Sequence, residues 1–195
     1  MILCLNLMRL LEKNLSMDNY IRVYENVLNK SICDSVIEKF EKNKDQQEVV
    51  KDEGVSFTQI DFAKHDGWGF ENKTIFNTLM QYVGQYANDC KIKQVWPKTQ
   101  GYESLRIKRY FPDGKDEFTE HVDVMDYATA KRFLVIFLYL NDNDEGQTIF
   151  PGQDFTSQCK QGNVLIFPPL WPWQHAGRKP IETPKYIVGS YLHYT

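Results

Sequence analysis

The second half of the chain alternates strand-like runs with turn residues, and this pattern constrains the fold more than any other feature. Residues 101–195 contain six runs rich in β-branched and aromatic residues, separated by clusters of Gly, Pro, Asn and Asp. No helical periodicity intervenes, so we predict antiparallel pairing into a sandwich or jelly roll. The runs are ESLRIKRYF (103–111), DEFTEHVD (116–123), KRFLVIFLYL (131–140), QTIF (147–150), NVLIF (163–167) and KYIVGSYLHY (185–194).

The run at 131–140 is apolar on both faces, which is typical of a strand between a barrel interior and covering helices. The first half of the chain supplies such helices. Apolar residues recur at helical spacing after Ser31, a candidate N-cap, and again over roughly 72–89. We also predict strands at 20–27 and 55–63, with a polar loop at 44–54 between them.

The predicted fold class is therefore α+β, with a double-stranded β-helix (jelly-roll) core that N-terminal helices buttress on one outer face. One domain spans residues 17–195, with helical support over 17–100 and the jelly-roll core over 101–195. Residues 1–16 are an N-terminal extension, either an amphipathic helix or a stretch upstream of a start at Met17. Their apolar run is too short for a membrane span.

Composition excludes several classes of protein. A net charge of −3 gives no overall attraction to nucleic acid or to an anionic membrane. The four cysteines are scattered and form no CxxC pair, which argues against a zinc cluster or a disulfide framework. We expect reduced thiols in a cytoplasmic protein without membrane partners, and the sequence leaves its oligomeric state open.

Three residues are candidate metal ligands. In an extended strand, His121 and Asp123 point to the same face, and His175 follows a later strand-like run. Two histidines and one carboxylate suit the facial triad of a non-haem Fe(II) oxygenase, and they also suit zinc. An HxD pair alone is a weak signal. Lys185 begins the last strand, where an ammonium inside a barrel needs an anionic partner.

The order and spacing of several motifs resemble the Fe(II)/2-oxoglutarate-dependent dioxygenases, and within them the prolyl 4-hydroxylase-like subgroup. The resemblance covers roughly residues 100–194. The motifs are Tyr110 ten residues before HVD (121–123), Arg132 before YLN (139–141), GQTIF (146–150), GNVLIF (162–167), and HAG (175–177) followed by Lys185.

This resemblance implies a role for each matching residue. His121, Asp123 and His175 match the iron ligands, and Lys185 matches the lysine that pairs with the C5 carboxylate of 2-oxoglutarate. Tyr110 and Tyr139 match tyrosines that contact this co-substrate. Arg132 matches a family position without a defined role. The implied cofactors are Fe(II), 2-oxoglutarate and O2, with ascorbate as a candidate reductant.

The departures from the family pattern lie in loops. Glu145-Gly146 replaces a double glycine, IETPK (181–185) lacks the glycine usual before the lysine, and the segment 111–120 is slightly long. By resemblance these loops shape the substrate entrance, so the departures bear on the substrate. Nearby, Trp171 and Trp173 either line that entrance or form a packed lip.

The resemblance implies hydroxylation of a protein or peptide side chain, with proline as the first candidate. The same chemistry on a free amino acid, another small molecule or an alkylated nucleobase is the first alternative. By resemblance, nucleobase demethylases with this chemistry carry paired arginines after the distal histidine. Here Arg178 is the one arginine after His175, so a nucleobase substrate is disfavoured. A non-catalytic jelly-roll binding module and a zinc hydrolase are further alternatives.

Overall fold

Strand β7 (Arg132–Tyr139) is apolar on both faces because each face packs against a different layer of the molecule. Leu134 and Ile136 belong to a core cluster between the sheet and the helices. Val135 and Tyr139 belong to a second cluster inside the sheet. The strand is therefore buried on both sides, as the sequence predicts.

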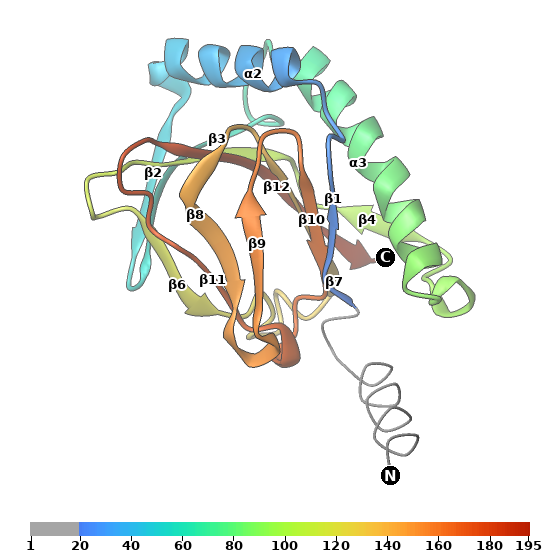
Figure 1. The fold of residues 1–195 in the computed structure, drawn as a ribbon. Coiled ribbons are helices and arrows are strands. Elements are labelled where there is room, and N and C mark those ends of the chain that lie inside the picture. Colours follow the sequence, from blue (N-terminus) through green and yellow to red (C-terminus); the bar gives the residue numbers. More distant parts are fainter. Residues whose placement is uncertain (1–19) are drawn as a thin grey trace.

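The computed structural model describes residues 20–195, in which antiparallel strands curl into an almost closed barrel with helices outside it (Figure 1). This confirms the predicted fold class. The elements are β1 (Arg22–Tyr24), α2 (Lys30–Lys42), η2 (Lys44–Gln46), β2 (Glu48–Asp52), β3 (Val55–Asp61), α3 (Gly69–Asp89), η3 (Lys93–Val95), β4 (Gln100–Tyr102), β5 (Arg106–Tyr110), β6 (Glu117–His121), β7, β8 (Asn143–Phe150), η4 (Pro151–Gln153), β9 (Phe155–Cys159), β10 (Val164–Phe167), η5 (Trp171–Trp173), β11 (His175–Gly177) and β12 (Lys185–Tyr194).

The sheet order is β1-β10-β7-β12-β5-β3-β6-β11-β8-β9, with β2 added beside β3 and β4 beside β12. Strand β12 lies centrally, between β7 and β5. Its residues alternate as period-two geometry requires: Ile187 and Tyr191 face the interior cluster, and Tyr186 and Val188 face the outer one. Lys185 has the same parity as Ile187, so it points into the barrel.

The helices α2 and α3 cover the outside of the sheet (Figure 1). Helix α2 buries Cys33, Val36 and Phe40. Helix α3 buries Ile75, Leu79, Val83, Tyr86 and Ala87. The spacing of these residues gives each helix one apolar stripe, which packs on the sheet. None of the described helices combines the length and apolar character that a bilayer span requires.

Several local predictions are wrong. The N-cap of α2 is Asn29, which has extended backbone geometry and accepts a hydrogen bond from the Ser31 amide at 2.9 Å. The polar segment 44–54 contains β2, an edge strand that is exposed at four of its five positions and forms a hairpin with β3. The short strands β4, β9 and β11 were also not predicted as strands. The predicted extension at residues 1–16 lies outside the described residues.

Gly162 ties the start of the domain to the sheet. Its carbonyl accepts a hydrogen bond from the Val27 amide at 2.8 Å, and its φ of +80° is a conformation that favours glycine. A Cβ at this position would lie 2.5 Å from the carbonyl oxygen of Leu28. We expect Gly162→Ala to lower the free energy of unfolding in urea by about 1–3 kcal/mol. Gly152→Ala, whose Cβ would meet no atom within 4 Å, is the control and should change stability little.

Candidate metal centre

The three candidate ligands converge at one end of the barrel. His121 ends β6 and pairs directly with His175, which begins β11. Asp123 lies beyond the end of β6, where its amide donates to the Pro169 carbonyl. The predicted placement of His121 and Asp123 on one continuous strand is therefore wrong, because the chain leaves the sheet between them. Their ligand atoms, with that of His175, nevertheless all lie within 4.8 Å of one another.

Backbone carbonyls fix the orientation of both imidazoles. The Nδ1 atom of His121 lies 2.7 Å from the Thr119 carbonyl oxygen, and that of His175 lies 3.1 Å from the Trp173 carbonyl oxygen. A carbonyl oxygen only accepts, so each Nδ1 carries the proton and each Nε2 keeps its lone pair. Both Nε2 atoms face the Asp123 carboxylate, at 3.7 and 3.6 Å. This is the arrangement that metal-binding histidines require.

The electrostatics of the three residues also suit a cation. Burial lowers the pKa of His175 to about 4, so its imidazole is neutral at physiological pH. The pKa of Asp123 is lowered although burial opposes this, and the hydrogen bond that the Tyr191 hydroxyl donates favours the ionised carboxylate. The buried atoms His121 Nε2 and Asp123 Oδ2 have no hydrogen-bond partner among residues 20–195. Because buried polar atoms are rarely left unsatisfied, these residues fit a metal ion that binds between them.

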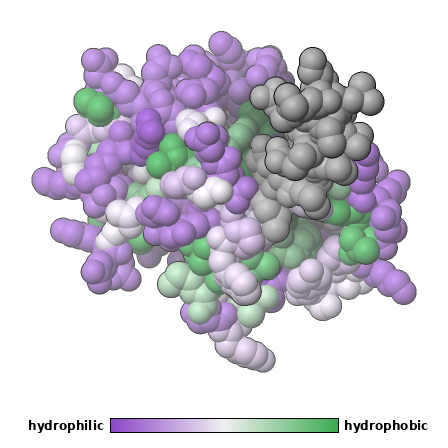
Figure 2. Space-filling view, turned by 60° about the horizontal axis from the view of Figure 1, so that its bottom comes forward, coloured by the Kyte–Doolittle hydropathy of each residue, from purple (hydrophilic) through white to green (hydrophobic). Residues whose placement is uncertain are grey.

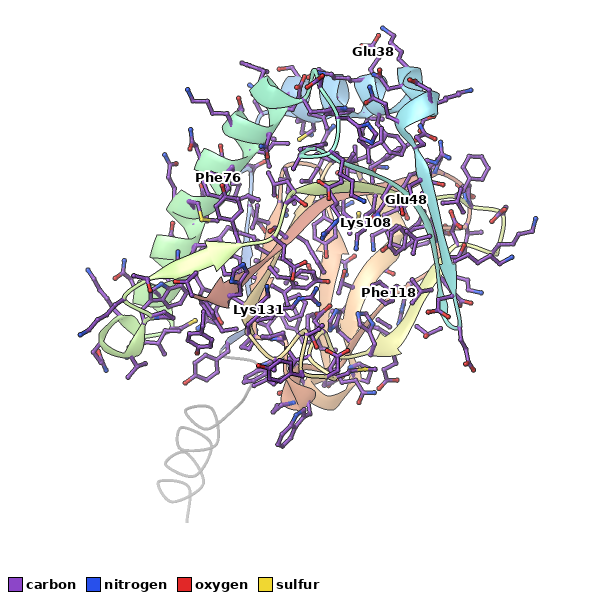
Figure 3. All side chains as sticks on the ribbon, turned by 180° about the vertical axis from the view of Figure 1, so that it is seen from behind. Glu38, Glu48, Phe76, Lys108, Phe118 and Lys131 are labelled. Carbon is purple, nitrogen blue, oxygen red and sulfur yellow. The ribbon has the colours of Figure 1, made fainter. Side chains whose placement is uncertain are left out.

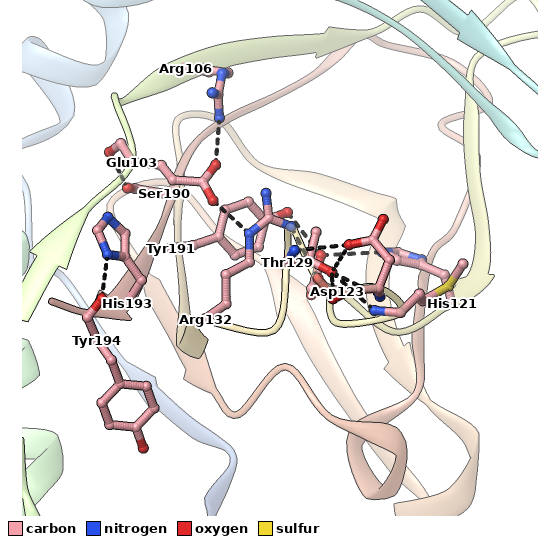
Figure 4. Close-up of polar contacts among 12 residues, drawn as sticks. Glu103, Arg106, His121, Asp123, Thr129, Arg132, Ser190, Tyr191, His193 and Tyr194 are labelled. Carbon is pink, nitrogen blue, oxygen red and sulfur yellow. Dashed lines mark hydrogen bonds and ion pairs between the residues drawn. The ribbon is translucent and has the colours of Figure 1, made fainter.

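A network of side chains holds Asp123 in place (Figure 4). The Tyr191 hydroxyl donates to Asp123 Oδ1 at 2.8 Å, and Arg132 donates to the Asp123 carbonyl at 3.0 Å. Arg132 also pairs with Glu103 at 2.6 Å and lies 3.9 Å from the Tyr191 ring centroid. The structure thus gives Arg132 a positioning role. Tyr191 was missed in the sequence, although it shares the strand parity of Lys185.

We expect Tyr191→Phe to weaken metal binding about 10–100-fold, the usual cost of losing a partner of a metal ligand. Burial and the Asp123 carboxylate raise the pKa of Tyr191, so its hydroxyl stays protonated and donates. Anaerobic titration with Mn(II) measures the effect. Tyr186→Phe is a matched control, since its hydroxyl bonds Glu41 on the outer face at 2.8 Å. An equal loss of affinity in both variants would contradict the role of Tyr191.

Lys185 lies inside the same barrel and is 3% exposed. It forms no hydrogen bond or ion pair with any described residue, and burial lowers its pKa. Two glycines lie against its side chain: a Cβ on Gly146 would lie 2.9 Å from Lys185 Cδ, and one on Gly177 would lie 3.6 Å from Nζ. An ammonium without an anionic partner among the described residues fits the carboxylate of a bound molecule.

The two candidate tyrosines flank this lysine. The Tyr110 and Tyr139 ring centroids lie 5.6 and 5.8 Å from Lys185 Nζ. The Tyr139 hydroxyl is already hydrogen-bonded to Thr148 at 2.8 Å and Ser157 at 3.2 Å. The Tyr110 hydroxyl has no hydrogen-bond partner in the described part of the chain, so it is the better placed of the two to bind a ligand oxygen.

A second lysine inside the barrel was missed in the sequence. Lys108 on β5 pairs with Ile187 of β12, and its Nζ lies 4.5 Å from the Phe57 ring centroid and 5.8 Å from that of Phe118 (Figure 3). Phe118 in turn stacks on the His121 imidazole at 3.7 Å. Burial lowers the pKa of Lys108 to about 8. Lys108 lies two residues before Tyr110 in the same strand, so both side chains point to the inner face. This spacing could have predicted the position of Lys108 from the sequence.

A cleft with a volume of ≈ 750 Å³ is lined by two of the three candidate ligands, His121 and Asp123. The β2–β3 hairpin, β6, the loop after β6, η5 and β12 all contribute to its walls. Trp171 lines the cleft and is 79% exposed, whereas Trp173 packs against the interior cluster. From the sequence, each tryptophan either lines an entrance or packs as a lip. In the structure, Trp171 lies in the cleft wall and Trp173 packs on the interior cluster.

The fold is similar to solved structures of prolyl hydroxylases, although no protein-family model and no curated protein matches the sequence. The viral collagen prolyl hydroxylase of Paramecium bursaria Chlorella virus-1, in its 2-oxoglutarate complex, gives a TM-score of 0.68 at 19% identity over 90% of this chain and 96% of that one. A prolyl-4-hydroxylase from Pseudomonas putida gives 0.65 at 11% identity over 90% and 93%.

A third similar structure is a Trichoplax adhaerens prolyl hydroxylase in complex with a hypoxia inducible factor oxygen degradation domain peptide. Its TM-score is 0.66 at 14% identity, over 90% of this chain and 84% of that one. The chain therefore has a prolyl 4-hydroxylase-like 2-oxoglutarate oxygenase fold, as the motifs predict. Within that fold lie the His121, Asp123 and His175 cluster and the buried Lys185, which has no ion pair with a described residue.

Proposed function

We propose that this protein is an Fe(II)- and 2-oxoglutarate-dependent dioxygenase that hydroxylates a protein or peptide side chain, with proline as the first candidate target. The observation that carries the proposal is the convergence of His121, Asp123 and His175 in the same barrel as Lys185, which is buried without an ion pair to any described residue. Two histidines and a carboxylate leave open positions on a metal, and the lysine supplies a cation for a dicarboxylate.

Each of these residues has a defined task in the proposed reaction. His121 and His175 present neutral Nε2 atoms to the metal, and Asp123 presents a carboxylate that Tyr191 orients. Lys185 pairs with the far carboxylate of 2-oxoglutarate, and the Tyr110 hydroxyl is placed to donate to the same group. When bound, Fe(II) with 2-oxoglutarate and O2 supplies the oxidant that inserts oxygen into a C–H bond, with release of succinate and CO2.

The choice of a peptide substrate is supported by the fold and by the site. The similar structures are prolyl hydroxylases, and the one from Trichoplax adhaerens contains a bound peptide. The cleft above the candidate ligands is open, with exposed Trp171 and Met125 on its walls, which suits a chain segment more than an enclosed small molecule.

The test is turnover under controlled O2. The protein is purified anaerobically and given Fe(II) and 2-oxoglutarate, O2 is admitted, and succinate is followed by NMR with a panel of proline-containing peptides. We expect succinate to require O2 and a peptide to gain the mass of one oxygen atom. Absence of Fe(II) and 2-oxoglutarate binding would favour a binding module. Hydrolysis that needs zinc but neither O2 nor 2-oxoglutarate would favour a zinc hydrolase.

A further inference from the structure

The cleft above the candidate metal centre has an unbalanced charge. Four exposed carboxylates line it: Asp52 and Glu53 at the tip of the β2–β3 hairpin, Glu120 on β6, and Asp126 in the loop after β6. None of the four forms an ion pair with a described residue. The chain as a whole has a net charge of −3, and these four carboxylates give the cleft a negative charge of its own.

Arg132 is the one lysine or arginine among the described residues that line the cleft, and it does not offset these carboxylates. Arg132 is already paired with Glu103 at 2.6 Å and also donates to the Asp123 carbonyl. Asp126 accepts hydrogen bonds from Thr129, which lower its pKa and keep it ionised. The walls of the cleft therefore present uncompensated negative charge to whatever enters.

Apolar side chains stand among these carboxylates. Trp171 on η5 is 79% exposed and Met125 is 78% exposed, and both line the cleft. The face that contains this end of the barrel shows hydrophobic residues set among hydrophilic ones (Figure 2). An exposed indole face attracts a cation, and an exposed thioether packs against the methylene stem of a long side chain. Carboxylates next to such groups match lysine and arginine side chains.

A separate observation indicates that the cleft holds a ligand. Asp123 is 7% exposed, lines the cleft, and has a buried Oδ2 atom without a hydrogen-bond partner in the described part of the chain. The His121 Nε2 atom, which likewise has no partner among the described residues, lies beside it. The acidic walls therefore surround the entrance to a centre that is itself built for binding, so whatever reaches that centre must pass between them.

We infer that the cleft receives a basic peptide segment, in which lysine or arginine residues flank the side chain that reaches the metal centre. This inference rests on the proposed function and names its substrate class. The flanking cations meet Asp52, Glu53, Glu120 and Asp126 on the cleft walls, and their stems pack on Trp171. The same charges repel phosphates, which argues against a nucleic acid in this cleft.

Binding measurements without turnover test the inference. Protein loaded with Mn(II) and 2-oxoglutarate under anaerobic conditions is titrated with three proline-containing peptides of equal length, whose flanking residues are Lys/Arg, Gln or Glu. A short single-stranded oligonucleotide is the fourth probe. We expect the basic peptide to bind most tightly, with an affinity that falls as salt is added. Tightest binding of the acidic peptide, the neutral peptide or the oligonucleotide would overturn the inference.

Two triple variants separate the cleft from the overall charge. Asp52→Asn/Glu53→Gln/Glu120→Gln should weaken basic-peptide binding roughly 10-fold, the size expected from losing three exposed ion pairs. Asp45→Asn/Asp66→Asn/Glu182→Gln changes the net charge equally at exposed positions that do not line the cleft, and should leave binding unchanged. Equal weakening in both would overturn the inference. Succinate formation without a preference for charge contradicts this inference alone, whereas basic-peptide binding without succinate contradicts the proposed enzyme alone.

Discussion

Asp123→Asn is expected to weaken metal binding by more than about 100-fold, because even losing a partner of a metal ligand costs 10–100-fold. The substitution keeps the shape of the side chain and its hydrogen bond with Tyr191, but removes the charge that faces His121 and His175. Wild-type protein with Mn(II) at 100 times its Kd should gain about 2.7 kcal/mol in unfolding free energy. The variant should lose this gain, together with O2-dependent succinate formation.

The comparison of metal-free and metal-loaded protein isolates the ligand role. Metal-free Asp123→Asn should unfold near the wild-type midpoint, so a lower midpoint without metal would point to a structural role. Asp66→Asn, on an exposed aspartate that does not line the cleft, is the control and should keep the full response to Mn(II). If Asp123→Asn also kept that response, Asp123 would not be a ligand.

Lys185→Met is expected to have two opposite effects. The variant keeps the apolar stem but removes a buried ammonium that has no ion pair in the described structure, so the protein without 2-oxoglutarate should become more stable to urea. The affinity for 2-oxoglutarate should fall by roughly 10- to 100-fold, because a charge-assisted bond to a carboxylate is lost. Calorimetry with the Mn(II)-loaded protein measures this loss, and Mn(II) affinity itself should not change.

The pH dependence of stability gives a second test of Lys185. Burial lowers its pKa in the folded state, so at high pH the unfolded chain binds more protons than the folded one. Unfolding free energy should therefore rise with pH between the lowered pKa and the ordinary value of 10.5, and Lys185→Met should lose this contribution. Lys179→Met, on an exposed lysine, is the control. An unchanged pH profile together with unchanged 2-oxoglutarate affinity would refute the role of Lys185.

The sequence predicts those strands and helices in which buried apolar residues recur at regular spacing. The run at 131–140 has apolar or aromatic residues at every position from 133 to 140, and a strand covered on both faces explains it. Strand β2, in contrast, has four exposed residues out of five and is held mainly by pairing with β3. No apolar period can reveal such an edge strand. Strand β11 has three residues, too few for any period to show.

Some residues of the candidate site could be predicted from sequence motifs, and others could not. The residues taken from ordered motifs, His121, Asp123, His175 and Lys185, lie in or beside one barrel, and their roles remain predictions. Tyr191 and Lys108 carry no motif. Their relation to the site depends on β12 lying beside β5 and on Phe118 lying between Lys108 and His121, which are contacts between distant segments. The alternation of side chains along a strand predicts that both point into the barrel. It does not predict which of the candidate metal-binding residues they lie beside.

The central place of β12 has a consequence for the order in which the protein is made. Every other described strand precedes β12 in sequence, yet β12 fills the gap between β7 and β5. During synthesis these two strands have no common partner until residues 185–194 leave the ribosome, so their inner edges stay open. We expect nascent chains that stop before residue 185 to expose those edges and to depend on chaperones, even though all three candidate metal ligands have already been made.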